Sequence, residues 1–393
     1  MLRIDDEERR ARLARRHGVA PGRRLDTVEQ AAGAMVALHA TDPAGLFLSA
    51  WARVDGFTVP DLERALHDDR TLVKHMVMRR TLFAVPRESM PVVQAAASRR
   101  IAAVERRRLE RELGEAALVD DPSRWFDAAA AAVVRHLGAG EPLTSTQLRE
   151  RIPELDLAIA YGAGKSWAGR AGVGPRVLTC LQASGTVLRA GNAGPWTTSR
   201  PTWALTRDWL GADLPELDED AARAELVARW LGAFGPGTVR DLRWWLGSTV
   251  AAVRRALADV GAVEVELDGG TGHVLPDDVE PVGAVDPWVA LLPGLDPTTM
   301  GWTERAWYLG PHGPQVFDSA GNAGPTIWVD GRVVGGWTVT PAGDVELVLL
   351  EDVGRDARRA IDAEAERLTA WLDGTEVRPR FPPALTRSAA RSP

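Results

Sequence analysis

The stretch TVRDLRWWLGSTVAAVRRALADVGAVEVELDGGTGHVLPD, residues 238–277, contains a local pattern of two helices and a hairpin. Thr238 can cap the first helix, TVRDLRWWLG, and TVAAVRRALADVG predicts the second. The runs VEVELDG and HVLPD, with a Gly-Gly turn at 269–270, predict a compact β-hairpin. With the preceding helix DAARAELVARWLGAFG, the segment therefore reads as three helices followed by two strands.

The same order occurs upstream. SRWFDAAAAAVVRHLGAG, STQLRERI and GPRVLTCLQASG predict three helices, and VLRAG and TWALT predict two strands after them. Residues 1–118 fit this plan with additions, with helices expected across TVEQAAGAMVALHA and PDLERALHD and an extended LVKHMVMRRTLFAVP. Three helices followed by a two-stranded wing are typical of the winged helix-turn-helix, so the sequence predicts tandem winged-helix modules.

The last part of the chain changes character. WVALLPGLD, AWYLG, TIWVDGRVVGGWTV and VELVLLEDV are short β-suited runs, which favour a small antiparallel β-barrel, and a helix is expected at about 355–373. The predicted fold class is mainly α with β (α+β). The predicted divisions are winged-helix modules at 1–118, 119–212 and 213–275, a barrel with a terminal helix at 276–377, and a disordered tail at 378–393.

Composition limits the possible functions. The chain has a formal net charge of -7, but residues 1–110 hold 20 basic and 15 acidic side chains, so a local basic face remains compatible with DNA binding. The single cysteine, Cys180, excludes an internal disulfide framework and a cysteine-rich zinc site. No apolar run is long enough to span a bilayer, and the charged N-terminus lacks a signal pattern. We therefore expect a cytoplasmic protein that does not enter membranes.

Winged helices commonly present a helix to the major groove of DNA, although they also serve as protein-interaction modules. Arginines on the predicted helices can contact phosphates. For any single one of them a solvated surface residue is the better interpretation, but as a set on repeated helices they favour DNA. The candidates on the second and third modules are Arg149, Arg176, Arg240 and Arg243.

The sequence resembles the winged-helix DNA-binding family that includes the AlkZ-type and YcaQ-type DNA glycosylases. The resemblance covers nearly the whole chain and rests on LHATDPAGLFLSAWAR, MRRTLFAVP, FGPGTVRDLRWWLG, LLPGLDPTTMGWTERAWYL and WVDGRVVGGW. It implies further DNA-binding candidates: Arg53 at the end of the first motif, Arg79 and Arg80 in the second, and Trp302 and Arg305 in the fourth. Arg80 stands where the family usually has glycine, and core packing is the alternative for Trp302.

The resemblance also implies an active site. The family's glycosylases carry Gln-apolar-Gln or Gln-apolar-Asp where this chain has His39, Ala40 and Thr41, and the two polar side chains hold a water near the sugar of a flipped nucleotide. His39 and Thr41 therefore become candidate catalytic residues, and Asp42 can supply negative charge if it faces the same cavity. The alternative is that these side chains only satisfy backbone groups at a helix end.

The predicted function is a monofunctional DNA glycosylase that excises bulky alkylated or crosslinked purines from double-stranded DNA, in repair or in self-resistance to a genotoxin. We expect a monomer without cofactor or metal, because phosphate-loop and metal-ligand motifs are absent. The alternatives are a non-catalytic winged-helix protein that binds DNA or regulates transcription, and a protein-interaction scaffold.

Overall fold

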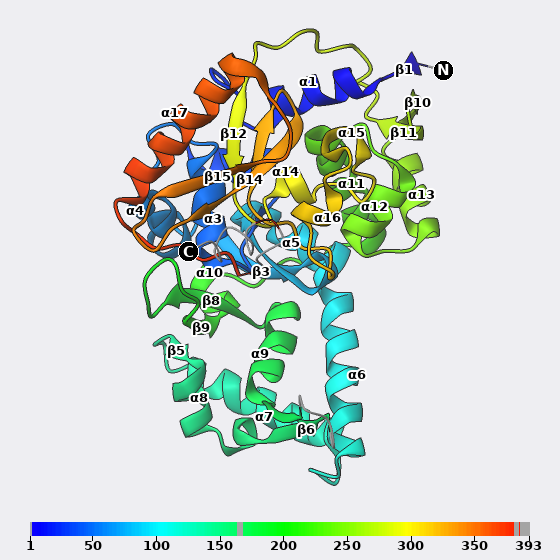
Figure 1. Cartoon of the computed structure of the whole chain (residues 1–393). Helices are drawn as coiled ribbons and strands as arrows, with labels where there is room; N and C mark the ends of the chain where they lie inside the picture. The colour runs from blue at the N-terminus through cyan, green and yellow to red at the C-terminus, as the bar shows by residue number, and fades with distance from the viewer. Residues whose placement is uncertain (1, 163–167, 381–384, 386–393) are drawn as a thin grey trace.

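The computed structural model describes residues 2–162, 168–380 and 385. It is a mixed α and β structure in which a large body and a smaller lobe are joined by the long helix α6 (Arg99–Glu115), as Figure 1 shows. None of the helices in these residues is long and apolar enough to cross a membrane.

The N-terminal region combines short helices with a three-stranded sheet. Its elements are β1 (Leu2–Arg3), α1 (Asp6–Arg16), α2 (Val28–Ala34), β2 (Leu38–His39), α3 (Pro43–Trp51), α4 (Val59–Glu63), the π-helical turn η1 (Arg64–Asp68), β3 (Leu72–Val77), the 3-10 turn η2 (Met78–Arg80), β4 (Thr81–Pro86), α5 (Met90–Val93) and α6. The sheet order is β2-β4-β3, and both pairings are antiparallel.

The start of this region corrects one sequence prediction. A single helix was expected across residues 27–40, but α2 ends at Ala34, and Val36 adopts a left-handed φ of 62°. Left-handed backbone is costly for a β-branched residue and interrupts a helix. Leu38 and His39 consequently pair with β4 as a strand.

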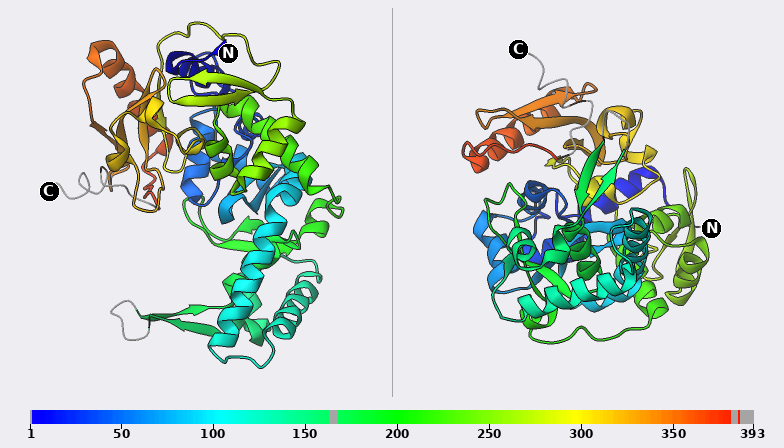
Figure 2. Two further views of the ribbon diagram at one scale, coloured as in Figure 1. Left: turned by 90° about the vertical axis from the view of Figure 1, so that its right-hand side faces the viewer. Right: turned by 90° about the horizontal axis from the view of Figure 1, so that it is seen from below.

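The second region follows the predicted order of elements. It contains α7 (Pro122–Leu137), β5 (Leu143–Thr144), α8 (Ser145–Arg151), β6 (Ala158–Tyr161), β7 (Gly169–Gly172), α9 (Gly174–Ala183), β8 (Val187–Asn192), β9 (Pro201–Leu205) and α10 (Thr206–Leu210). The hairpin of β6 and β7 was not predicted. Figure 2 shows it projecting from the lobe on the same side as the C-terminal sheet.

The third region contains α11 (Glu219–Phe234), α12 (Val239–Leu246), α13 (Val250–Asp259), β10 (Val263–Leu267) and β11 (Gly270–Val274), as predicted. The Thr238 side chain caps α12 by accepting a hydrogen bond from the amide of Asp241. The predicted hairpin gains a third strand, because β1 at the start of the chain pairs parallel with β10.

The C-terminal region contradicts the predicted barrel. It consists of β12 (Val289–Leu292), α14 (Pro297–Met300), α15 (Ala306–Leu309), α16 (Gly313–Val316), β13 (Thr326–Val329), β14 (Arg332–Val339), β15 (Val345–Leu349) and α17 (Gly354–Leu372). The strands form an open sheet, β12-β13-β14-β15, whose edge strands do not pair with each other. The run AWYLG, expected as a strand, forms the helical turn α15.

Two hydrophobic cores explain the two-part shape. One core joins the N-terminal, third and C-terminal regions, and the other lies within the lobe, between Leu109 and Leu205. Helix α1 fastens the start of the chain to a distant segment, because the buried Arg12 donates to the carbonyl oxygens of Asp278 and Glu280. The predicted tail lies outside the described residues except for Arg378–Arg380 and Leu385.

Candidate active site

His39 lies on β2, where strand pairing fixes its direction. It is in register with Phe83 of β4, and the centroids of the two rings are 5.1 Å apart. The side chain is buried, with 8% of its surface exposed. His39 is thus a buried residue of the sheet, and its ring is held by packing against Phe83.

The environment of His39 keeps its ring neutral. Burial, followed by the charge of Arg79, lowers the pKa of His39 to about 3, while Asp296 acts in the opposite direction. The amide of Thr41 donates a long hydrogen bond, 3.4 Å, to Nδ1 of His39. Because Nδ1 then accepts, the proton of the neutral ring resides on Nε2, which can donate to a water but cannot take a proton from it.

Thr41 and Asp42 follow in the turn that leads into α3. Thr41 is half-buried, and the Asp42 side chain is buried. The C-terminal segment crosses this turn: the amide of Arg380 donates to Oδ2 of Asp42 over 3.2 Å, and its guanidinium donates to the carbonyl oxygen of Thr41 over 3.0 Å. Burial raises the pKa of Asp42, and the amide of Arg380 opposes that shift.

The structure overturns the DNA-contact prediction for Arg53. Its side chain is fully buried and donates two hydrogen bonds to the carboxylate of Asp296, at 2.7 and 2.8 Å, and one to Oγ1 of Thr298. Burial would raise the pKa of Asp296, but the charge of Arg53 and the hydrogen bonds from Arg53, Ser49 and the amide of Thr298 together lower it. This ion pair joins α3 to the segment that opens α14, and DNA cannot reach it.

Trp302 is also interior, so the prediction that it stacks on a base is wrong. Only 2% of its surface is exposed, and its indole nitrogen donates to the carbonyl oxygen of Phe234. Its ring lies edge-to-face against Trp307 at a centroid distance of 4.9 Å. The alternative of core packing holds for this residue.

Arg79 and Arg305, in contrast, converge on one aromatic ring. Their guanidinium carbons lie 3.8 and 5.0 Å from the ring centroid of Trp244, a half-buried residue of α12. Among the described residues neither arginine has a carboxylate within 4.0 Å. Burial, followed by the charge of Arg305, lowers the pKa of Arg79 to about 10. These two unpaired cations suit an anion such as a DNA phosphate.

Arg80 stands at the position where the resemblance to the family predicts glycine. Arg79 and Arg80 adopt φ values of 55° and 61°, in the left-handed region where glycine carries no steric cost. Arg80 is exposed and pairs with Glu105 of α6 at 2.8 Å. Arg80 therefore takes a left-handed backbone conformation and adds a surface cation.

The remaining arginine candidates do not form one cluster of free cations. Arg149 and Arg240 are exposed and lie 3.7 and 3.5 Å from Asp156 and Glu304, and Arg243 is exposed on α12. Arg176 is the least available, because it donates to Glu112 over 2.6 Å and thereby holds α9 against α6.

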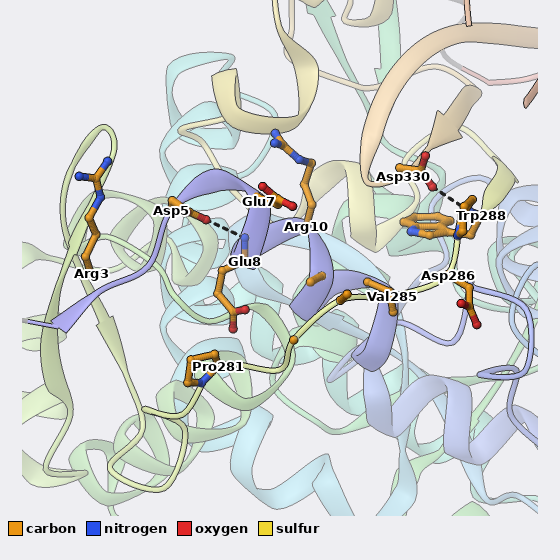
Figure 3. A pocket seen from close by; sticks show the side chains of 14 residues that line it. Arg3, Asp5, Glu7, Glu8, Arg10, Pro281, Val285, Asp286, Trp288 and Asp330 are labelled. Atoms are coloured by element: carbon orange, nitrogen blue, oxygen red, sulfur yellow. Dashed lines mark hydrogen bonds between the residues drawn. The ribbon is translucent and has the colours of Figure 1, made fainter. Parts of the chain in front are cut away.

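A cavity of about 550 Å³ lies between α1 and residues 281–288, and Figure 3 shows its lining. Its charged residues are mostly acidic, so it does not suit phosphate. They are Arg3, Asp5, Glu7, Glu8, Arg10, Asp286 and Asp330. No group of three or more potential metal ligands occurs within the part of the chain that the structure describes.

Sequence reasoning missed three partners of the candidate residues. In the sequence, Trp244 is one of two adjacent tryptophans in an amphipathic helix, and this pattern usually indicates core packing. Asp296 acts on both Arg53 and His39, yet it lies more than 240 residues from either. Arg380 fell in the predicted tail, where the sequence offers no signal for a contact with Thr41.

The fold and the site define a multi-region α and β protein with a buried polar motif and two arginines, Arg79 and Arg305, that have no carboxylate partner among the described residues. The family model described as "DNA glycosylase AlkZ-like" matches residues 32–371, so the chain belongs to the AlkZ-like DNA glycosylase family. An interstrand DNA cross-link repair glycosylase from Streptomyces sahachiroi is 32% identical over 184 residues, 44% of this chain. That match spans about half of the relative, 49% of its length.

The fold comparison covers more of the chain. The solved structure of the Streptomyces sahachiroi DNA glycosylase AlkZ is similar with a TM-score of 0.76 at 23% identity, covering 96% of this chain and 100% of the other. This similarity establishes the shared fold across the N-terminal motif, the lobe and the C-terminal sheet.

Proposed function

We propose that the protein is a DNA glycosylase that hydrolyses the N-glycosidic bond of bulky alkylated or crosslinked purines in double-stranded DNA. One observation carries the proposal: in a chain of the AlkZ-like family, His39, Thr41 and Asp42 lie together where the chain passes from the end of β2 to the start of α3. An N-alkylated purine leaves as a neutral base from a cationic nucleoside. The enzyme therefore has to hold one water and stabilise positive charge on the sugar.

The geometry supports different roles for His39 and Asp42 in the reaction. His39 presents an Nε2 proton and orients the water, because its Nδ1 accepts from Thr41. Asp42 supplies the negative charge that stabilises an oxocarbenium-like sugar and can take the proton of the attacking water. DNA that reaches these groups displaces Arg380, whose two hydrogen bonds to the turn are exposed or partly buried.

Several features support binding to duplex DNA. The order of three helices and two strands in the second and third regions is compatible with winged-helix modules, and the β6–β7 hairpin and the C-terminal sheet project on the same side. Arg79 and Arg305 add an unpaired positive pair close enough for Arg79 to act on His39. We further propose that the protein acts as a cytoplasmic monomer in repair or genotoxin self-resistance.

Base release from a duplex carrying an N7-alkylated guanine tests the proposal. In single turnover the protein should release the modified base and leave an abasic site. His39→Ala should slow release by about 100-fold or more while leaving duplex affinity unchanged, because it removes the water contact and no phosphate contact.

His136→Ala, on helix α7 of the lobe, is the matched control and should release base at the wild-type rate. Binding without release across a panel of alkylated duplexes would favour a non-catalytic DNA-binding protein. The absence of binding at low salt, where phosphate contacts are strongest, would leave only a protein-interaction scaffold.

A further inference from the structure

A cavity adjoins residues 39–42, here called the His39 turn. It lies on the face of the β2-β4-β3 sheet opposite His39. Lys74 of β3 is in register with Ala84 of β4, and Ala84 with Leu38, one position before His39. Side chains in register share a face and successive residues alternate, so Lys74 and His39 point to opposite faces. The cavity, about 30 Å³, is lined by Ala40, Leu82 and Lys74 together with η1 and the β8–β9 turn.

Two cations face this cavity from different parts of the fold. Lys74 comes from the N-terminal sheet and Arg189 from β8. Within the described residues neither has a carboxylate within 4.0 Å, and Nε of Arg189 is buried without a hydrogen-bond acceptor. Glu63 lines the cavity too, but it is exposed and beyond ion-pair distance of both.

The two charges destabilise each other. Burial, followed by the charge of Arg189, lowers the pKa of Lys74 to about 8. Burial, followed by the charge of Arg380, lowers the pKa of Arg189 to about 10. The charge of Glu63 opposes the shift of Lys74 from beyond ion-pair distance. A pair of partly desolvated cations without a counter-charge at ion-pair distance is costly, and an anion between them removes that cost.

The rest of the lining is compatible with an anion. His67 lies on η1, and burial followed by the charge of Lys74 lowers its pKa, so it is neutral at pH 7 and above. Ser199 contributes a hydroxyl group from the β8–β9 turn. Trp196 closes one side of the cavity by packing on Phe47, and the centroids of the two rings are 5.2 Å apart. The volume holds about two waters, which two oxygens of a phosphate group can replace.

We propose that Lys74 and Arg189 form a phosphate-binding site at the junction of the body and the lobe. On the proposed function, its occupant during the reaction is a backbone phosphate of the bound duplex. The site lies directly behind Ala40 and Pro43, so a phosphate held there fixes the strand close to the His39 turn. Free inorganic anions share the chemistry and serve as the probe.

Sulfate binding tests the site without any need for base release. The unfolding midpoint of the whole chain is measured against sulfate concentration, with chloride keeping the ionic strength constant. Sulfate should stabilise the wild type and Lys74→Arg, while Lys74→Gln and Arg189→Gln should weaken sulfate affinity about tenfold or more. Arg359→Gln, an exposed residue of α17, is the matched control and should bind sulfate like the wild type.

The pH dependence of sulfate binding shows whether Lys74 acts through its charge or only through packing. Sulfate keeps its charge between pH 7 and 9.5, whereas Lys74 loses its proton as pH rises through about 8. Sulfate affinity of the wild type should therefore fall above pH 8, and that of Lys74→Arg should not. Equal stabilisation of the wild type and Lys74→Gln by sulfate would overturn the proposal.

Duplex binding then identifies the source of the phosphate. Affinity for an unmodified duplex is measured over a range of salt concentrations, and Lys74→Gln should reduce the slope of log affinity against log salt by about 1, as expected for one lost phosphate contact. If sulfate binding is lost in Lys74→Gln but the slope is unchanged, the site takes free anions and the assignment to DNA is wrong. Base release plays no part in either readout, so a failed glycosylase assay leaves this test intact.

Discussion

Asp42 shows how one residue's environment sets a testable pH dependence. Burial raises its pKa above the ordinary 3.8, so its carboxylate begins to take up protons at a higher pH than an exposed aspartate. If ionised Asp42 stabilises the sugar cation, the rate of base release falls as pH decreases through that raised pKa. The acidic limb of the profile therefore lies above pH 3.8.

Asp42→Asn tests this role. It keeps the size of the side chain and removes the charge, so single-turnover base release should slow by about 100-fold and lose its acidic limb, with duplex affinity unchanged. The measurement is the rate of release from an alkylated duplex between pH 4.5 and 8. An unchanged profile in Asp42→Asn would remove Asp42 from the mechanism.

The residue scale is also where sequence reasoning reached its limit. The polar motif at 39–42 was identifiable because its members are neighbours in the chain. Arg53 looked like a surface cation because its partner, Asp296, is 243 residues away and only the fold brings them together. The sequence left both interpretations of Trp302 open, because a tryptophan in a Gly-rich segment can pack in a core or stack on a base.

At the scale of elements, the helices were more predictable than the sheets. The third region matches its prediction because caps, helix faces and a two-residue turn are local features. The C-terminal strands were predicted as strands, but whether a sheet closes depends on which edges meet, and that is a long-range property. The left-handed Val36, which converts the end of a predicted helix into β2, has no sequence signature.

Helix α12 leads to a second prediction. The guanidinium of Arg79 stacks on the ring of Trp244, and that of Arg305 contacts the same ring, so Trp244→Leu removes the platform of Arg79 and one contact of Arg305, which also packs on Phe317. Affinity for an undamaged duplex should fall about tenfold, measured by fluorescence anisotropy at low salt.

Trp209→Leu is the matched control. Trp209 on α10 stacks with Arg70 at 4.0 Å, so this variant removes a similar pair elsewhere in the molecule. Equal losses of affinity in Trp244→Leu and Trp209→Leu would show that the α12 arrangement has no special part in DNA binding.

For the molecule as a whole, buried histidines predict sensitivity to acid. Burial is the largest cause that lowers the pKa of His17 and His39 to about 3 and that of His75 to about 4. In the unfolded chain these groups take up protons near pH 6.5, while in the folded protein they stay neutral. Their contribution to stability is therefore complete above pH 6.5 and is lost as pH falls toward 3 to 4.

Each such histidine should lower the free energy of unfolding by about 2 kcal/mol between pH 7.5 and pH 5. Urea unfolding followed by tryptophan fluorescence measures this loss. His75→Gln, which retains a polar group next to Gln94, should remove about one third of the part that His17, His39 and His75 contribute. A free energy of unfolding that is constant from pH 7.5 to 5 would contradict the assignment.

The parallel pairing of β1 with β10 has a consequence for biosynthesis. Leu2 and Arg3 complete a sheet whose other members begin at Val263, and Arg12 finds its carbonyl acceptors at 278 and 280. At about 5–20 residues per second, the ribosome needs on the order of tens of seconds to reach those positions. During that interval the nascent first helix has no docking partner. Residues 2–16 are therefore among the last to reach their native place, although they are synthesised long before the segments that they contact.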